Sequence, residues 1–295
     1  MARNRITFVL LLLALLSSVL PALAQRGEGP IDPAPPKDKT PDQIIQTVAA
    51  KELEFQAARD RYVYRQSVKV EELDSDGGSV AGMYQQISDI TFDDQGRRSE
   101  NVVYAPQSTL KNIMMTKEDI DDIEHHFPFV ITTDTLPIYD VKYVGHQQVD
   151  ELGTYVFDLT PVHMQKGKRY FQGRIWVDDR DLMIVKTSGI GVPNDPTENQ
   201  PVPFTTWREQ IDGKYWFPTY TSGQTDIRAV DKHGRELAPP TPVRVVVKYT
   251  DYKQYKSTVK ITYGDEVVPP PQPQSTAPQQ QQQPNNNAPQ GSTPK

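Results

Sequence analysis

Cysteine is absent from all 295 residues of the chain. This absence excludes disulfide bonds, thiol catalysis and a lipid anchor attached through cysteine, so a chain of this length must depend on a hydrophobic core. An excess of positive charge is absent too, because 38 acidic residues outnumber 32 lysines and arginines and the formal net charge is −6. Nucleic-acid binding needs a basic face, and this balance argues against it.

The sequence also lacks the spacings of common catalytic and metal sites. None of its five histidines forms a zinc-binding pair, and there is no nucleophile elbow or phosphate loop. Residues 74–78 begin like a calcium loop, but Ser79 and Gln85 stand where such a loop needs glycine and glutamate. His125 and His126 are expected at the C-terminal end of an acidic helix, where cationic side chains interact favourably with the helix dipole. We therefore expect no enzyme, no metal and no cofactor. Four acids of that helix are expected to form a solvated face: Asp119, Asp121, Asp122 and Glu124.

The N-terminus predicts export. Arg3 and Arg5 precede an apolar run over residues 6–16, and Ala22-Leu23-Ala24 supplies a cleavage pattern. The run is too short to cross a bilayer core of about 30 Å, although an uncleaved anchor is the alternative. We expect residues 1–24 to be a signal peptide cleaved after Ala24. The product would be a soluble periplasmic protein of net charge −6 − 2 = −8, because the two arginines leave with it.

Two segments that cannot build a core bracket a single domain. Residues 25–39 are rich in proline and glycine and are expected to be a tether. Residues 268–295 are rich in proline, glutamine and asparagine and are expected to be a disordered tail that folding does not need. Residues 40–267 then form one domain, which is an ordinary size for an all-β sheet or barrel.

The order of elements predicts a sheet with few helices. Thr40 caps a helix that runs to about Arg59, with proline at its first position and Gln43 three residues after the cap. Strand alternation then recurs, and a change of apolar phase between Ile87 and Ile90 predicts a bulge. We expect ten or eleven strands, drawn from residues 62–70, 83–93, 98–104, 139–149, 154–162, 169–177, 182–186, 205–211, 214–221, 243–249 and 259–263.

Two hairpins define the sheet most clearly. In residues 169–186, Phe171, Ile175 and Val177 share one strand face, and Gly173 indicates a bend or a close neighbour. The second hairpin turns at Asp212-Gly213, a pair that accepts positive φ at both positions. The fold class is therefore α+β: a strongly curved antiparallel sheet that forms an incomplete (half) barrel over one or two helices.

An insert over residues 109–137 interrupts the strands. Thr116 begins a second short helix, and the flanking apolar residues predict that the insert folds over the open side of the sheet. It would act either as a lid that shifts when ligand enters or as a permanent plug. Aromatic and methionine side chains are candidates for the wall of a ligand cavity, with plain core packing as the alternative. The candidates are Met83, Met114, Met115, Phe127, Phe129, Phe171, Trp176, Trp207 and Trp216.

Three features together resemble the outer-membrane lipoprotein-sorting (LolA-like) superfamily, which includes LolA, LolB and RseB-type sensor domains. They are the N-terminal helix, the Phe171–Asp178 strand with Ile184-Val185-Lys186, and the hairpin sequence Ile211-Asp212-Gly213-Lys214-Tyr215-Trp216-Phe217-Pro218-Thr219. The resemblance covers residues 40–263 and implies an incomplete barrel with an apolar cavity for acyl chains. The expected function is a periplasmic, non-enzymatic and monomeric carrier or chaperone for lipid or lipoprotein acyl chains, working with envelope membrane proteins. The alternatives are an RseB-type sensor or scaffold that binds a protein partner and, third, a hydrolase. The long tail and the greater length depart from a minimal carrier.

Overall fold

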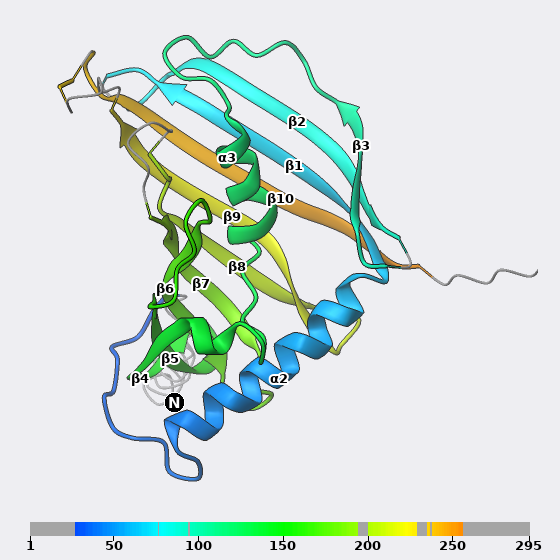
Figure 1. The fold of residues 1–295 in the computed structure, drawn as a ribbon, viewed down its shortest axis with the longest axis vertical. Coiled ribbons are helices and arrows are strands. Elements are labelled where there is room, and N and C mark those ends of the chain that lie inside the picture. Colours follow the sequence, from blue (N-terminus) through cyan, green and yellow to red (C-terminus); the bar gives the residue numbers. More distant parts are fainter. Residues whose placement is uncertain are drawn as a thin grey trace, which may run out of the picture. The chain divides into compact units, whose positions relative to one another are not determined.

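The computed structural model describes residues 27–255, apart from 76, 94, 194–199, 229–234 and 237. The predicted signal peptide over 1–24, the strand over 259–263 and the tail over 268–295 lie outside these residues. The described part contains one ten-stranded antiparallel sheet and a 19-residue helix, α2 (Pro41–Arg59) (Figure 1). The strands are β1 (Tyr62–Leu73), β2 (Val80–Phe92), β3 (Arg98–Tyr104), β4 (Tyr139–Val149), β5 (Leu152–Pro161), β6 (Tyr170–Asp178), β7 (Ile184–Val192), β8 (Phe204–Ile211), β9 (Tyr215–Ile227) and β10 (Thr241–Gln254).

The sheet is open, which confirms the predicted incomplete barrel. Its strand order is β3-β2-β1-β10-β9-β8-β7-β6-β5-β4, and β3 and β4 do not pair with each other. The sheet curls, and α2 lies across the face that carries the main core (Figure 1). The bulge expected near Ile87 is present, because the β2–β3 register shifts between Ile87 and Ser88.

Helix α2 begins where the sequence predicted. The Thr40 hydroxyl accepts a hydrogen bond from the Gln43 N–H at 3.2 Å, and the Gln43 side chain accepts one from the Thr40 N–H at 2.9 Å. This reciprocal capping box satisfies two of the donors that every helix start leaves unpaired. The helix buries Ile44, Val48 and Phe55 against the sheet together with one charged residue, Glu52.

The pairing of β6 with β7 explains why residue 173 is a glycine. Phe171, Ile175 and Val177 are buried in the main core, as their alternation predicted. Gly173 pairs with Gly189 on β7, and a Cβ atom at Gly173 would lie 2.3 Å from the Ser188 carbonyl oxygen. The close neighbour expected from the sequence is therefore the adjacent strand.

The Asp-Gly turn also has the expected backbone. Asp212 and Gly213 have φ values of 54° and 68°, which is the left-handed pair that this turn type requires. Ile211 faces Tyr215, so the connection has three residues, 212–214, and the predicted two-residue link is wrong by Lys214, which does not belong to the strand.

Residues 27–36 differ from the predicted tether, because they are held against the edge strand β4. The Gly29 N–H donates to Gln148 O at 2.8 Å, and Asp32 and His146 exchange two backbone hydrogen bonds, each of 2.8 Å. The Lys186 ammonium pairs with Glu28. Prolines do not prevent this contact, because an edge strand offers unpaired backbone groups that a non-regular segment can meet at single points.

Candidate ligand-binding site

The insert over residues 109–137 lies on the core side of the sheet and is fixed at its start by a buried carboxylate. Glu72 of β1 is fully buried. Its side chain accepts hydrogen bonds from the backbone N–H groups of Lys111, Asn112 and Ile113 at 2.9, 2.7 and 2.8 Å. Three donors on one carboxylate offset the cost of burying its charge.

The middle of the insert is a short helix that changes geometry. Thr116 caps α3 (Lys117–Asp121), as the sequence predicted, and the chain continues as one π-helical turn, η1 (Asp122–His126). Ile123 and Phe127 then enter the main core beside β1, β9 and β10. Figure 1 shows this helix in front of the central strands.

Charged groups hold this middle part on both sides. Asp122 Oδ2 accepts from Arg169 at 2.7 Å, and its Oδ1 lies 2.9 Å from His126 Nδ1. Glu124 pairs with Arg98 of β3 at 2.7 Å. Asp122 is only 6% exposed, so the expectation of a solvated acidic face is wrong at this position; burial is compensated by the arginine and histidine beside it.

The His126 ring lies between two oxygen acceptors. Nε2 is 3.1 Å from the Arg169 carbonyl oxygen, and Nδ1 faces Asp122. Burial alone would lower the pKa of His126, but Asp122 and the carbonyl favour the cation, and the pKa is raised above its usual value. A neutral imidazole has only one N–H, so the charged ring suits this position better.

A third attachment holds the end of the insert: the buried side chain of Arg208 on β8. Its guanidinium donates to both Glu52 oxygens at 3.0 and 3.1 Å and to the Phe129 carbonyl oxygen. The Thr206 hydroxyl donates to Phe127 O at 2.7 Å. Helix α2, strand β8 and the insert therefore meet at one buried ion pair.

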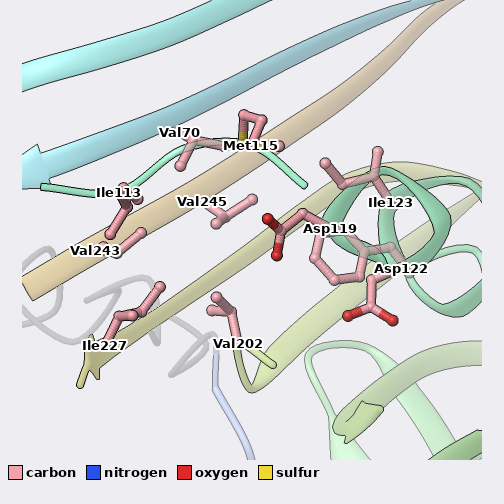
Figure 2. Close-up of a pocket in the computed structure, with 11 residues that line it drawn as sticks. Val70, Ile113, Met115, Asp119, Asp122, Ile123, Val202, Ile227, Val243 and Val245 are labelled. Atoms are coloured by element: carbon pink, nitrogen blue, oxygen red, sulfur yellow. The ribbon is translucent and has the colours of Figure 1, made fainter. Parts of the chain in front are cut away.

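A cavity of about 30 Å³ remains under the insert, between α3–η1 and strands β1, β9 and β10. Figure 2 shows the Asp119 and Asp122 carboxylates at one side of this space and apolar side chains around the rest. The volume is close to that of one water molecule. The lining residues are Val70, Ile113, Met115, Asp119, Asp122, Ile123, Phe127, Val202, Ile227, Val243 and Val245.

The structure separates the nine candidate wall residues into different places. Met115 and Phe127 line the cavity. Phe129 and Phe171 stack deeper in the same core, with ring centroids 4.2 Å apart. Met114 is 80% exposed.

The other four candidates lie on the opposite face of the sheet. Met83 pairs with Glu71 on that face, and Trp176 belongs to a separate cluster with Val185. A ligand-binding role for these residues is not supported by their position, because strand neighbours point to opposite faces. Lys186 lies between two of the tryptophans, 4.3 Å from the Trp176 ring and 5.8 Å from the Trp207 ring. Trp216 packs at the edge of the Trp176 cluster.

The cavity wall that sequence reasoning missed consists mainly of ordinary strand residues. Val70, Val243, Val245 and Ile227 alternate as any buried strand does, so nothing local distinguishes a cavity wall from a packed core. The described residues contain no group of three or more histidine, aspartate or glutamate side chains placed to hold a metal. Nor does any described helix have the length and apolar character to cross a membrane.

No family model and no curated protein matches the chain. Solved structures of the superfamily that the sequence resembles are similar to it. They include a LolA superfamily protein from Nitrosomonas europaea (14% identity, 71% of this chain and 94% of that one, TM-score 0.31) and a putative outer membrane lipoprotein-sorting protein domain from Vibrio parahaemolyticus (9%, 72% and 93%, 0.33). MucB in the MucA/MucB complex of Pseudomonas aeruginosa is a third (12%, 71% and 99%, 0.20). At these TM-scores, no ligand, partner or residue role is transferred from them.

Proposed function

We propose that this protein is a periplasmic, non-enzymatic carrier or chaperone for an apolar ligand, namely lipid or the acyl chains of a lipoprotein. The observation that supports it is the apolar cavity between the insert and strands β1, β9 and β10. Nine of its eleven lining residues are apolar, and apolar walls with a few polar groups are typical of small-molecule sites.

The cavity must enlarge before it can hold an acyl chain. Its 30 Å³ is far below the roughly 300–1,000 Å³ of ordinary ligand pockets. Glu72 fixes the start of the insert and Arg208 fixes its end, so the part between them is the part that moves. Moving it breaks the Asp122–Arg169 and Glu124–Arg98 pairs and the hydrogen bond from Thr206 to Phe127 O, and it withdraws Ile123 and Phe127 from the core. The insert is thus proposed to be a lid whose own side chains occupy the site when ligand is absent.

Two adjacent methionines provide a matched test of this proposal. Met115 lines the cavity, whereas Met114 is 80% exposed. We expect Met115→Ser to weaken binding of a fluorescent fatty acid about tenfold, because replacing the apolar side chain with serine removes roughly 1–2 kcal/mol of apolar burial from the site. Met114→Ser should leave affinity unchanged.

Urea unfolding of both variants and mass spectrometry of lipids extracted from the natively purified protein complete the experiment. A wild-type protein that binds no fatty acid and carries no lipid would refute the carrier function. In that case the insert is a plug, and Met115→Ser should reduce stability without any effect on binding.

A second candidate function is a scaffold that binds a protein partner, and one observation favours it. The β4 edge of the sheet is covered by residues 27–36, but no described residue pairs with the outer edge of β3. Val102, Val103 and Tyr104 at this edge are about half exposed, at 51, 51 and 50%. An uncovered edge can take an additional extended strand. A photo-crosslinking residue at Val103 should then capture one defined envelope protein, whereas the same residue at Tyr220 should not.

A further inference from the structure

A larger cavity lies on the other side of the insert, at the C-terminal end of α2. Its volume is about 270 Å³, equivalent to roughly nine water molecules. It shares no lining residue with the cavity under the insert. The insert contributes to both cavities: Ile113, Met115, Asp119, Asp122, Ile123 and Phe127 to the first, and Glu124, His125, Pro128 and Val130 to the second.

Four aromatic rings form much of this second wall: Tyr64, Phe92, Tyr249 and Tyr252. The Tyr64 ring lies near all three others in tilted arrangements, with ring centroids 5.1 to 6.5 Å apart. The Tyr252 hydroxyl is fixed, because it donates to Pro218 O at 2.6 Å. The rings therefore offer an apolar surface of defined, angled shape, which suits an apolar body of a ligand.

Two hydrogen-bond donors at this wall are not fully satisfied by the described residues. Tyr249 is 3% exposed, and its hydroxyl makes no hydrogen bond of ordinary distance and angle among the described residues; Thr221 and Gln66 lie near enough to act only as weak partners. The Arg59 guanidinium lies 5.6 Å over the Phe92 ring, and its Nε is buried without a partner among the same residues. An unpaired buried donor is costly, so each such group in a native protein needs an explanation.

The charges around the cavity define what can meet these donors. Arg98 is already paired with Glu100 and Glu124. Asp60 Oδ1 lies 3.8 Å from Arg59 Nη2 and offsets part of its charge. His125, at the rim, lies 3.2 Å from Asp121. Three carboxylates thus stand near two arginines, and a further full negative charge is disfavoured relative to a neutral acceptor.

We propose that this cavity, termed the arginine–tyrosine pocket (Arg59, Tyr64, Phe92, Tyr249 and Tyr252 with their neighbours), is a second binding site. It takes the uncharged ester carbonyl of a ligand with an apolar body, with the Arg59 guanidinium and the Tyr249 hydroxyl as donors. An ester is proposed rather than an amide, because the one acceptor beside these donors without a hydrogen-bond partner among the described residues, Asp60 Oδ1, lies 3.8 Å from Arg59 Nη2 and already offsets part of its charge. The proposal does not depend on the fatty-acid site under the insert, since the two share no wall residue.

A series of small probes with one aromatic body tests the chemistry. Methyl benzoate carries the ester, benzamide adds a donor, benzoate adds a charge and propylbenzene has no acceptor. NMR titration of the full exported chain, following the Arg59 Nε–H signal, should show methyl benzoate binding at least tenfold more tightly than the other three. Tyr249→Phe and Arg59→Met should each weaken methyl benzoate binding about tenfold.

Stability distinguishes a binding role from a structural one. Because the Tyr249 hydroxyl makes no well-formed hydrogen bond among the described residues, Tyr249→Phe should leave the urea midpoint unchanged or raise it while reducing affinity. Tyr220→Phe, the same change on the opposite face of the sheet, should alter neither property. Met115→Ser should not affect methyl benzoate binding, which separates this proposal from the function proposed above.

Three results would overturn the inference. Propylbenzene that binds as tightly as methyl benzoate would make the pocket a plain apolar cavity. Loss of stability in Tyr249→Phe with unchanged affinity would make the hydroxyl a structural group. No response to any probe would show that the cavity holds only water.

Discussion

The Glu52–Arg208 pair should be the most sensitive single interaction in the described domain. Both side chains are almost completely inaccessible, at 0 and 1% exposure, and two hydrogen bonds of 3.0 and 3.1 Å join them. Arg208→Met removes the guanidinium, keeps a long apolar side chain and leaves the Glu52 carboxylate buried without its partner. Removing one member of a buried pair costs about 3–5 kcal/mol. For a domain of this size, that corresponds to a fall of roughly 6–20 °C in Tm.

Several contributions act in the same direction in this variant. Arg208 also donates to the Phe129 carbonyl oxygen, so the end of the insert loses its donor. The remaining Glu52 carboxylate is out of contact with solvent. It must therefore either take up a proton or draw water into the core, and both cost free energy. The free energy of unfolding from urea titration at pH 7 measures the total. Arg65→Met is the matched control, because Arg65 forms an equally short pair with Asp89 at 2.8 Å but is 44% exposed, where such pairs contribute little.

The pH dependence of the same variant checks the cause. Burial raises the pKa of Glu52 already in the wild type, while Arg208 opposes this shift. Without Arg208 the folded-state pKa rises further above its unfolded value. An acid with a raised folded pKa contributes stability below its unfolded pKa and loses it as pH rises through the folded pKa. Arg208→Met should therefore be closer to wild type near pH 4.5 than at pH 8.

A double variant completes the reasoning. Glu52→Leu combined with Arg208→Met replaces the pair with apolar side chains and should recover most of the lost stability, as such replacements do in other proteins. If Arg208→Met lowered the free energy of unfolding by less than about 1 kcal/mol, water would have to reach the pair, and its burial could not be the source of its contribution.

Two further results are expected. Gly173→Ala should destabilise the β6–β7 hairpin by about 1–3 kcal/mol in urea unfolding, because its Cβ would lie 2.3 Å from Ser188 O; Gly27→Ala, where the new atom meets nothing within 4 Å, is the control. His126 has a raised pKa, so its contribution to stability is complete below about pH 6.5 and is lost as pH rises through the folded value. The difference in unfolding free energy between wild type and His126→Gln should hence be larger at pH 6 than at pH 8.5; an equal difference at both pH values, or the same behaviour in the exposed variant His163→Gln, would contradict this.

Local signals in the sequence predicted the fold well where local physics decides the structure. The capping box at Thr40, the second cap at Thr116 and the Asp212-Gly213 turn all depend on neighbouring residues alone. The bulge after Ile87 could be predicted because a change of apolar phase has to be absorbed somewhere in the strand.

The contacts of residues 27–36 could not be predicted in the same way. Composition identified a proline-rich segment with no core of its own, but its partner is the free edge of β4, which exists only after the sheet has formed. The burial of Glu52, Glu72 and Asp122 has the same origin: a carboxylate on a helix or strand looks the same in sequence whether it meets water, a distant arginine or the backbone N–H groups of a distant segment.

The candidate site shows a different kind of error. Alternation within a strand already places Phe171 and Trp176 on opposite faces, so these two residues could not both line one cavity. The prediction followed aromatic character, whereas the cavity under the insert is lined mainly by valine and isoleucine, together with Met115 and Phe127 of the nine candidates; a ligand-binding role for the nine stays a prediction. The face of the sheet that the insert covers depends on the position of the insert, and strand alternation does not predict that position.

The way in which the insert is attached connects its structure with the proposed lid. Apolar contacts alone allow a segment to slide, because dispersion has no preferred direction, whereas hydrogen bonds to buried carboxylates fix particular backbone atoms. Glu72 holds three consecutive N–H groups at one end, and Arg208 holds a carbonyl at the other. Between these points the attachments are of two kinds: Glu124–Arg98 is about 20% exposed on each side, whereas the Asp122–Arg169 pair and the hydrogen bond from Thr206 to Phe127 O are buried. Breaking the partly exposed Glu124–Arg98 pair costs less than freeing Glu72 or Glu52, so the buried Asp122–Arg169 pair is the main ion pair that opposes movement. An incoming apolar chain that replaces Ile123 and Phe127 would restore much of the burial that they lose, so the middle of the insert can move while both ends stay in place.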